Sequence, residues 1–185
     1  TLQATIKATI LIGPFFSDII VETKKTKKYL LKSLGLDKYK KIIAYIDTPG
    51  GLYSLLNINS YKLFISKLID LSKEYPENYY LFKSKKSYSE IQKLCDGELN
   101  SMLDQISISE NILYVNNSSL SVYQAMGISD FIVSGPKSSV IYEALHAHIP
   151  TICYDTSESL ARNSVYHEIS RCNAFNETEL MRLHD

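Results

Sequence analysis

The sequence predicts an α/β fold, a doubly wound parallel sheet flanked by helices. Short apolar runs alternate along the chain with longer segments of helical periodicity. The run at residues 42–46 is apolar at every position, as a strand covered on both faces requires. The 185 residues contain no repeat and no low-complexity linker. We therefore expect a single domain over residues 1–185.

The amino-terminal quarter is predicted to hold a strand and a helix. The strand covers residues 9–12 and is followed by a Gly13-Pro14 loop. The helix runs from Glu22 to Leu34, and Gly35 is placed to end it, since glycine readily adopts the left-handed conformation of a helix terminus. Its apolar residues share one side of the helix: Tyr29, Leu30, Leu31 and Leu34.

The middle of the chain alternates strand and helix. After the strand at 42–46, a helix that stops before Pro76 is marked by apolar residues at helical spacing. A strand follows at residues 79–82, and Ser87 with Glu90 has the form of a capping box that opens another helix. The apolar residues that mark the first of these helices are Tyr61, Phe64, Ile65, Leu68 and Ile69.

The carboxyl-terminal part supplies three more strands, at residues 112–115, 131–133 and 151–154. A helix over 121–128 precedes the second of them, and another helix follows Ser139. In an open parallel sheet the ligand binds beyond the carboxyl ends of the strands. The loops after each strand are therefore where functional residues are expected.

The loop from Ser134 to Ser139 has the composition of a phosphate-binding loop. Gly135 permits close backbone approach, and Pro136 stiffens the turn. Ser138 and Ser139 place hydroxyl and N–H groups at a helix N-terminus, where an anion is favoured. The same residues also fit an ordinary N-cap of a buried helix. The predicted phosphate contacts are Ser134, Gly135, Pro136, Lys137, Ser138 and Ser139.

Glu143 lies one helical turn beyond these serines, within reach of a ribose attached to the bound phosphate. The alternative is a solvated surface charge. After the last strand, Tyr154, Asp155 and Glu158 are candidates to contact a sugar or ribose of the ligand, although surface caps of this composition are equally common.

Two further loops carry candidate ligand contacts. Thr48, Gly50 and Gly51 follow the strand at 42–46, and a Pro-Gly-Gly turn can direct N–H groups at a ligand or be only a turn. The lysines after the strand at 79–82 can neutralise a diphosphate or a sugar carboxylate. They are Lys83, Lys85 and Lys86.

Composition excludes several classes of function. The chain has 20 Lys and Arg against 20 Asp and Glu, so it lacks the basic excess of a nucleic-acid-binding protein. Its three cysteines form no Cys-x-x-Cys pair, which argues against a disulfide framework and a zinc site. No metal or other cofactor is expected. We expect a cytoplasmic location, because this cysteine pattern fits a reducing compartment. No apolar run approaches the length of a membrane span.

One local charge cluster remains, the lysine-rich region at residues 24–41. Its simplest interpretation is a solvated helix surface. The alternative is peripheral contact with an anionic membrane at its inner face, or with a polyanionic acceptor.

The order of these carboxyl-terminal segments resembles the donor-binding half of GT-B glycosyltransferases. The segments are residues 129–134, 138–145 and 149–155. The likeness is to bacterial surface-polysaccharide enzymes, namely the CDP-glycerol glycerophosphotransferases and the sialyl- and Kdo-transferases, and the UDP-N-acetylglucosamine 2-epimerases share the half-fold. The resemblance to the glycerophosphotransferases and sialyltransferases implies a Lys-x-His-Pro or His-Pro motif at the lysine loop, residues 83–86, and this motif is absent.

The resemblance implies a Rossmann-like domain that forms the carboxyl-terminal half of a larger two-domain transferase. Its ligand would be a nucleotide-activated sugar or polyol phosphate, and the glycan or lipid-linked acceptor would bind an amino-terminal domain that also holds the general base. This chain alone should then bind the donor without turnover. Half of a UDP-sugar 2-epimerase and a non-catalytic nucleotide-binding module remain alternatives.

Overall fold

The computed structural model describes residues 17–47, 57–93, 97–116, 118–136, 138–157, 173–174 and 178–180. The strands are β1 (Ile42–Ile46), β2 (Tyr79–Lys83), β3 (Ile112–Val115), β4 (Phe131–Ser134), β5 (Thr151–Tyr154) and β6 (Asn173–Ala174). The helices are α1 (Ser17–Ser33), α2 (Ile58–Glu74), α3 (Tyr88–Lys93), α4 (Gly97–Ile108), α5 (Val122–Ile128) and α6 (Val140–His146).

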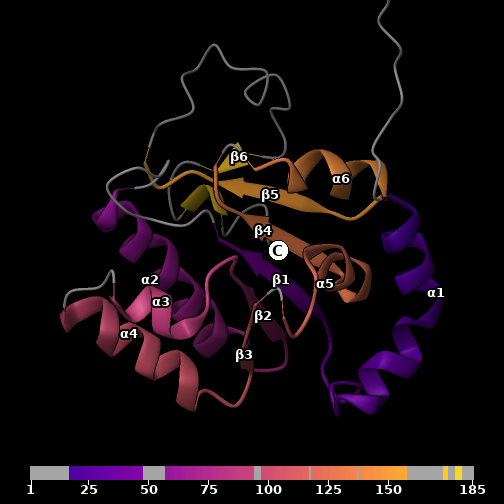
Figure 1. Cartoon of the computed structure of the whole chain (residues 1–185), viewed down its shortest axis with the longest axis horizontal. Coiled ribbons are helices and arrows are strands. Elements are labelled where there is room, and N and C mark those ends of the chain that lie inside the picture. The colour runs from indigo at the N-terminus through magenta and orange to yellow at the C-terminus, as the bar shows by residue number, and fades with distance from the viewer. Residues whose placement is uncertain are drawn as a thin grey trace, which may run out of the picture.

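The six strands form one sheet in the order β3-β2-β1-β4-β5-β6, and every neighbouring pair is parallel (Figure 1). The chain builds outward from β1 to β3, then crosses back and builds outward again from β4. Strand order therefore reverses between β1 and β4, as in Rossmann folds. The predicted doubly wound α/β architecture is confirmed.

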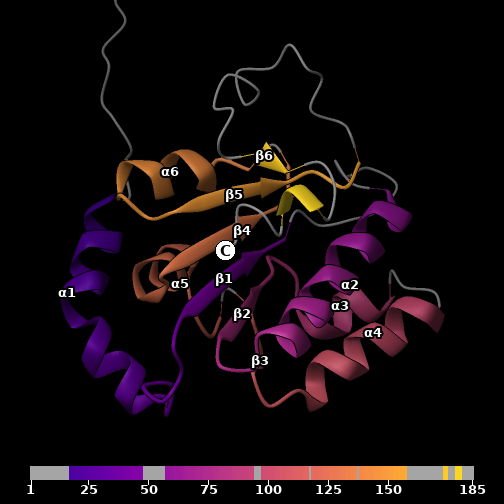
Figure 2. The same cartoon turned by 180° about the vertical axis from the view of Figure 1, so that it is seen from behind.

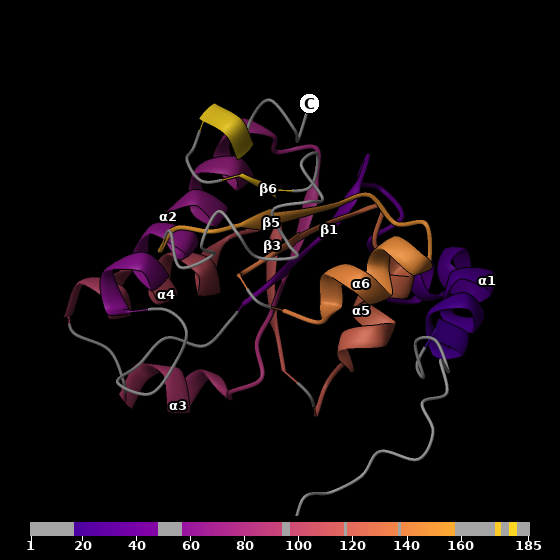
Figure 3. The ribbon, with the colours of Figure 1, turned by 90° about the horizontal axis from the view of Figure 1, so that it is seen from above.

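Helices cover both faces of the sheet (Figure 3). Helices α2, α3 and α4 lie on one face, and α1, α5 and α6 lie on the other, as the view from behind also shows (Figure 2). Side chains of β1 alternate between the two resulting cores: Tyr45 packs with α2, whereas Ala44 and Ile46 pack with α1, α5 and α6. Burial on both faces explains the uninterrupted apolar sequence of β1.

Helix α1 differs from its prediction at one end and on one side. It begins at Ser17, five residues earlier than expected, and the predicted buried residues Tyr29 and Leu34 are 76% and 52% exposed. The reason is tertiary packing, because α1 lies along α5 and buries a stripe that starts at Ile20 and Thr23. Our assignment of the buried side was therefore wrong for Tyr29 and Leu34.

The predicted end of α1 at Gly35 is confirmed. Gly35 has a φ of 68°, and its N–H donates to Lys32 O at 3.1 Å while Leu36 N donates to Leu31 O at 2.8 Å. These are the two hydrogen bonds of a Schellman motif, and Leu36 packs beside Leu31 in the core.

The other predicted elements lie close to their expected bounds. The Ser87–Glu90 capping box is confirmed, since Ser87 N donates to Glu90 Oε2 at 2.7 Å and Glu90 N donates to Ser87 Oγ at 3.3 Å. Ser121 and Gln124 form a second capping box at the start of α5. Strand β6 was not predicted, and the predicted strand at residues 9–12 lies outside the described residues.

Gly127 of α5 lies directly against α1, and it provides a test of this packing. A Cβ atom there would lie 2.5 Å from Thr23 Cβ and 3.0 Å from Ile20 O. We expect Gly127→Ala to lower the free energy of unfolding by about 1–3 kcal/mol, because the helices must separate to admit a methyl group.

The matched control is Gly97→Ala at the start of α4, where an added Cβ meets nothing within 4 Å. Its effect should stay within about 1 kcal/mol. Urea denaturation measures both variants, and equal effects of the two substitutions would contradict the described contact between α1 and α5.

Candidate functional site

The carboxyl ends of β2, β1 and β4 lie side by side, and this edge carries most of the predicted site residues that the structure describes. In the sheet register, Ile46 is paired with Lys83 on one side and with Ser134 on the other. Hydrogen bonds extend this pairing past the strand ends: Asp47 N donates to Lys83 O at 3.0 Å, and Gly135 N donates to Ile46 O at 2.9 Å. The β1 and β4 loops lead to α2 and α6 on opposite faces, the arrangement in which such folds bind ligands.

Asp47 is the first residue after β1 and is only 4% exposed. Its Oδ2 accepts a hydrogen bond of 2.9 Å from the Tyr61 hydroxyl on α2, whereas Oδ1 is buried and has no hydrogen-bond partner in the described part of the chain. Burial raises the pKa of Asp47 to about 6, opposed by the Ser84 and Tyr61 hydroxyls, the charge of Lys83 and the backbone N–H of Lys85.

Lys83 is buried beside this carboxylate. It is 2% exposed, and its Nζ donates to Ser84 O at 2.9 Å. Burial lowers the pKa of Lys83, the negative charge of Asp47 raises it, and the positive charge of Lys85 lowers it. The predicted cation at this loop therefore lies beneath the surface, close enough to Asp47 for the two charges to influence each other, while Lys85 is exposed and Lys86 is half-buried.

The serine loop after β4 combines a buried beginning with an accessible end. Ser134, Gly135 and Pro136 are buried, whereas Ser138 is half-buried and Ser139 is exposed. Ser139 occupies the N-cap position of α6 but makes no side-chain hydrogen bond to the helix. The capping alternative for Ser139 therefore has no hydrogen bond to support it, and its hydroxyl is accessible to a ligand.

Glu143 lies in the first turn of α6, on the face of the sheet opposite Asp47. It is half-buried, and its Oε2 is a buried oxygen without a hydrogen-bond partner among the described residues. The negative charge of Glu143, together with burial as the larger cause, raises the pKa of Tyr123 on α5. Glu143 therefore lies near enough to α5 to influence Tyr123 and is not a fully solvated charge.

The residues at the end of β5 make packing contacts and hydrogen bonds within the domain. The ring of Tyr154 is buried against Phe64, with centroids 6.1 Å apart. Asp155 is fully buried, and its Oδ1 accepts hydrogen bonds from Ser157 N at 3.0 Å and Ser157 Oγ at 2.7 Å. Both residues organise the loop, and their ligand roles stay predictions.

Several predicted residues lie outside the described part of the chain: Thr48, Gly50, Gly51, Lys137 and Glu158. Sequence reasoning also missed participants at this edge. Asp47 was not among the predicted site residues, and Tyr61 was predicted only as an apolar residue of a helix. The available signal was the position of a carboxylate directly after a fully apolar strand.

The lysine-rich region is largely engaged within the fold. Lys24 Nζ donates to Ala147 O at 2.7 Å, Lys27 pairs with Asp130, and Lys25 Nζ lies 2.5 Å from Glu22. Its contact with a membrane surface stays a prediction. None of the described helices combines the length and the apolar composition that crossing a bilayer requires.

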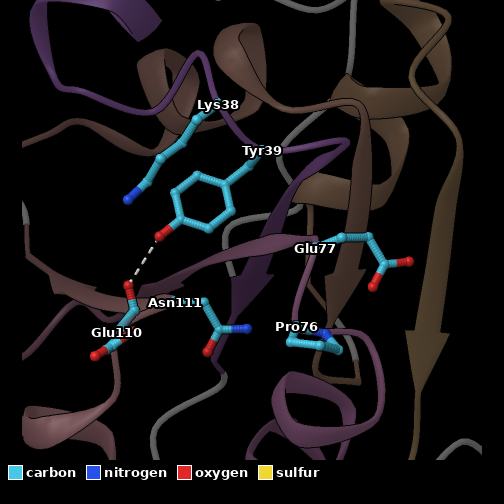
Figure 4. A pocket seen from close by; sticks show the side chains of 6 residues that line it. All are labelled: Lys38, Tyr39, Pro76, Glu77, Glu110 and Asn111. Atoms are coloured by element: carbon cyan, nitrogen blue, oxygen red, sulfur yellow. Dashed lines mark hydrogen bonds between the residues drawn. The ribbon is translucent and has the colours of Figure 1, made fainter.

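A shallow pocket of about 430 Å³ opens near the amino ends of β1, β2 and β3 (Figure 4). Within it the Tyr39 hydroxyl donates to Glu110 O at 3.1 Å, and Lys38 Nζ lies 5.0 Å from the centre of the Tyr39 ring. This pocket is at the edge opposite the predicted site, and none of the predicted contacts lines it. Its lining residues are Lys38, Tyr39, Pro76, Glu77, Glu110 and Asn111.

The raised pKa of Asp47 predicts an unusual pH dependence of stability. Because the folded state binds this proton more tightly than the unfolded state, the stability that Asp47 contributes is greatest below about pH 4 and is lost as pH rises through about 6. The shift from 3.8 to about 6 corresponds to a loss of roughly 3 kcal/mol.

The measurement is urea denaturation of the wild type and Asp47→Asn from about pH 4 to 7. Other titrating groups cancel in the difference between the two proteins. We expect the variant to gain on the wild type as pH rises. A difference that does not vary with pH would show that Asp47 is not held in the perturbed state described above.

Comparison with known proteins identifies the chain by family. The family model described as "Polysaccharide biosynthesis PFTS motif protein" matches residues 6–183. The chain contains the sequence Pro14-Phe15-Phe16-Ser17, which has the residues of that motif at three of four positions. No curated protein matches the chain. With nearly all of its length matched, the chain belongs to the polysaccharide biosynthesis PFTS motif protein family.

Proposed function

We propose that this domain binds a nucleotide-activated sugar or polyol phosphate as the donor of a GT-B-type transferase in surface-polysaccharide synthesis. The observation that carries the proposal is the reversal of strand order between β1 and β4. It brings the start of the serine loop beside the end of β1, at the edge where such sheets bind nucleotides. Membership of a polysaccharide biosynthesis family supports the choice of a sugar or polyol as the transferred group.

The phosphates would lie at the serine loop. The hydroxyls of Ser138 and Ser139 and the backbone N–H groups around them are donors suited to phosphate oxygens. Lys85 is exposed after β2, which is separated from β4 by β1, and it can add positive charge to the same edge of the sheet. Donors and cations held in place before the reaction stabilise the negative charge that grows on a leaving nucleoside phosphate, and this is the principal task of a donor domain.

The carboxylate of Glu143 would accept hydrogen bonds from the ribose hydroxyls. It lies one turn beyond the serines on the same helix, and its Oε2 has no partner among the described residues. The acceptor and the general base would belong to a second domain. The isolated domain is therefore expected to bind the donor without transferring its sugar.

The serine loop gives the first test of this function. Replacing Ser138 and Ser139 by Ala should weaken nucleotide binding by about 1–3 kcal/mol, the usual cost of losing hydrogen bonds to a charged group. Folding should be unaffected, because Ser139 makes no side-chain cap. Isothermal titration calorimetry with CMP, CDP, UDP and their sugar conjugates measures the affinity.

A matched control is the double Ala variant of Ser101 and Ser107, two exposed serines of α4. It should leave the affinity unchanged. If the Ser138/Ser139 variant binds the nucleotides as the wild type does, the serine loop is not the phosphate site.

Glu143 gives a test that separates ribose from phosphate recognition. Glu143→Ala should weaken the binding of nucleoside phosphates by about tenfold or more, because the carboxylate accepts from the ribose hydroxyls, but it should leave pyrophosphate binding nearly unchanged. The Ser138/Ser139 variant should weaken both ligands.

Circular dichroism of the Glu143→Ala variant controls for loss of the α6 structure. Equal losses of affinity for nucleotide and pyrophosphate would mean that Glu143 acts only through the stability of α6.

A further inference from the structure

Asp47 carries a buried oxygen, Oδ1, that has no hydrogen-bond partner among the described residues, although the Ser84 hydroxyl and the Lys85 N–H lie close enough to the carboxylate to lower its pKa. The Tyr61 hydroxyl holds Oδ2 at 2.9 Å and so fixes the orientation of the carboxylate, which leaves Oδ1 without a hydrogen-bond partner. A buried acceptor left in this state is costly. Asp47 also follows β1 directly, at the reversal of strand order where the proposed donor binds. A hydrogen-bond acceptor that lacks a partner at this position is suited to a hydroxyl or N–H group of a ligand.

The chemistry of Asp47 restricts which part of the donor it can meet. A carboxylate repels phosphate oxygens, and the adjacent Lys83 favours its ionised form. Phosphates are better accommodated across the edge at the serine loop, where the exposed hydroxyl of Ser139 lies. A neutral hydroxyl both donates a hydrogen bond and avoids charge repulsion. The bond it gives to a carboxylate is of the strong, charge-assisted kind.

We propose that Asp47 is a specificity-determining residue that accepts a hydrogen bond, through Oδ1, from a hydroxyl of the sugar or polyol part of the donor. This inference rests on the proposed function and adds a substrate class to it. The part of the transferred group that meets Asp47, at the end of β1, is therefore an uncharged sugar or polyol that carries several hydroxyl groups. A sugar that presented a carboxylate there would be repelled by Asp47.

The first experiment uses the wild-type domain and follows Asp47 directly. Carbon-13 NMR of the aspartate carboxyl groups measures the pKa of Asp47 with CDP against CDP-glycerol, and with UDP against UDP-N-acetylglucosamine. A hydroxyl that donates to the carboxylate stabilises its charged form. At least one conjugate should therefore give a lower Asp47 pKa than its parent nucleotide. Equal or higher values with both conjugates would overturn the inference.

The second experiment compares affinities by calorimetry. Asp47→Asn keeps the size of the side chain but removes its charge, and should weaken binding of that conjugate roughly ten- to a hundredfold while changing affinity for the parent nucleotide by less than about twofold. The matched control is Asp37→Asn, since Asp37 is exposed and precedes β1 near the opposite edge. It should change neither affinity.

The outcomes separate this inference from the function on which it rests. Equal weakening of conjugate and parent nucleotide by Asp47→Asn would refute the role in sugar recognition while leaving nucleotide binding established. Absence of any nucleotide binding by the wild type would refute both. If Asp47→Asn does not fold, the wild-type carboxyl titration decides the question by itself.

Discussion

The structure depends most on the pairing of β1 with β4. These strands are far apart in sequence, yet they lie side by side in parallel, and the hydrogen bond from Gly135 N to Ile46 O continues the pairing past their ends. Because the chain winds outward in both directions from this pair, the loops that follow lead to opposite faces of the sheet. The Asp47 carboxylate and the serine loop thereby share one edge, and each remains anchored to a different core.

The buried pair of Asp47 and Lys83 works against stability at this same edge. Burial disfavours both charges, and it raises the pKa of the acid and lowers that of the base. Hydrophobic side chains of similar volume would often be at least as stable in such positions. This loss of stability occurs at the strand ends and not deeper in the sheet. It is understandable if Asp47 and Lys83 serve to bind a ligand. Energetics and topology thus indicate the same edge.

Local sequence signals predicted most of the fold. Strands β1 to β5, the Gly35 helix end and the Ser87–Glu90 capping box each have a cause within a few residues. The buried side of α1 was mispredicted because contacts with α5, distant in sequence, determine it. For the site, the sequence indicated which loops hold it but not how their side chains are arranged. Nothing local to the lysine loop shows that Lys83 is buried while Lys85 is exposed, or that Tyr61 reaches Asp47.

The most direct test of where this domain binds its ligand is an amide NMR titration of the nitrogen-15-labelled domain with CDP-glycerol and UDP-N-acetylglucosamine. If donors bind at the reversal of strand order, the largest shifts will fall at Asp47, at Ser84 and Lys85, and at Gly135, Ser138 and Ser139. The amides of Tyr39 and Asn111, beside the pocket at the opposite edge, will not move. Saturable shifts confined to that pocket would contradict the account, as would no shifts at any concentration of either donor.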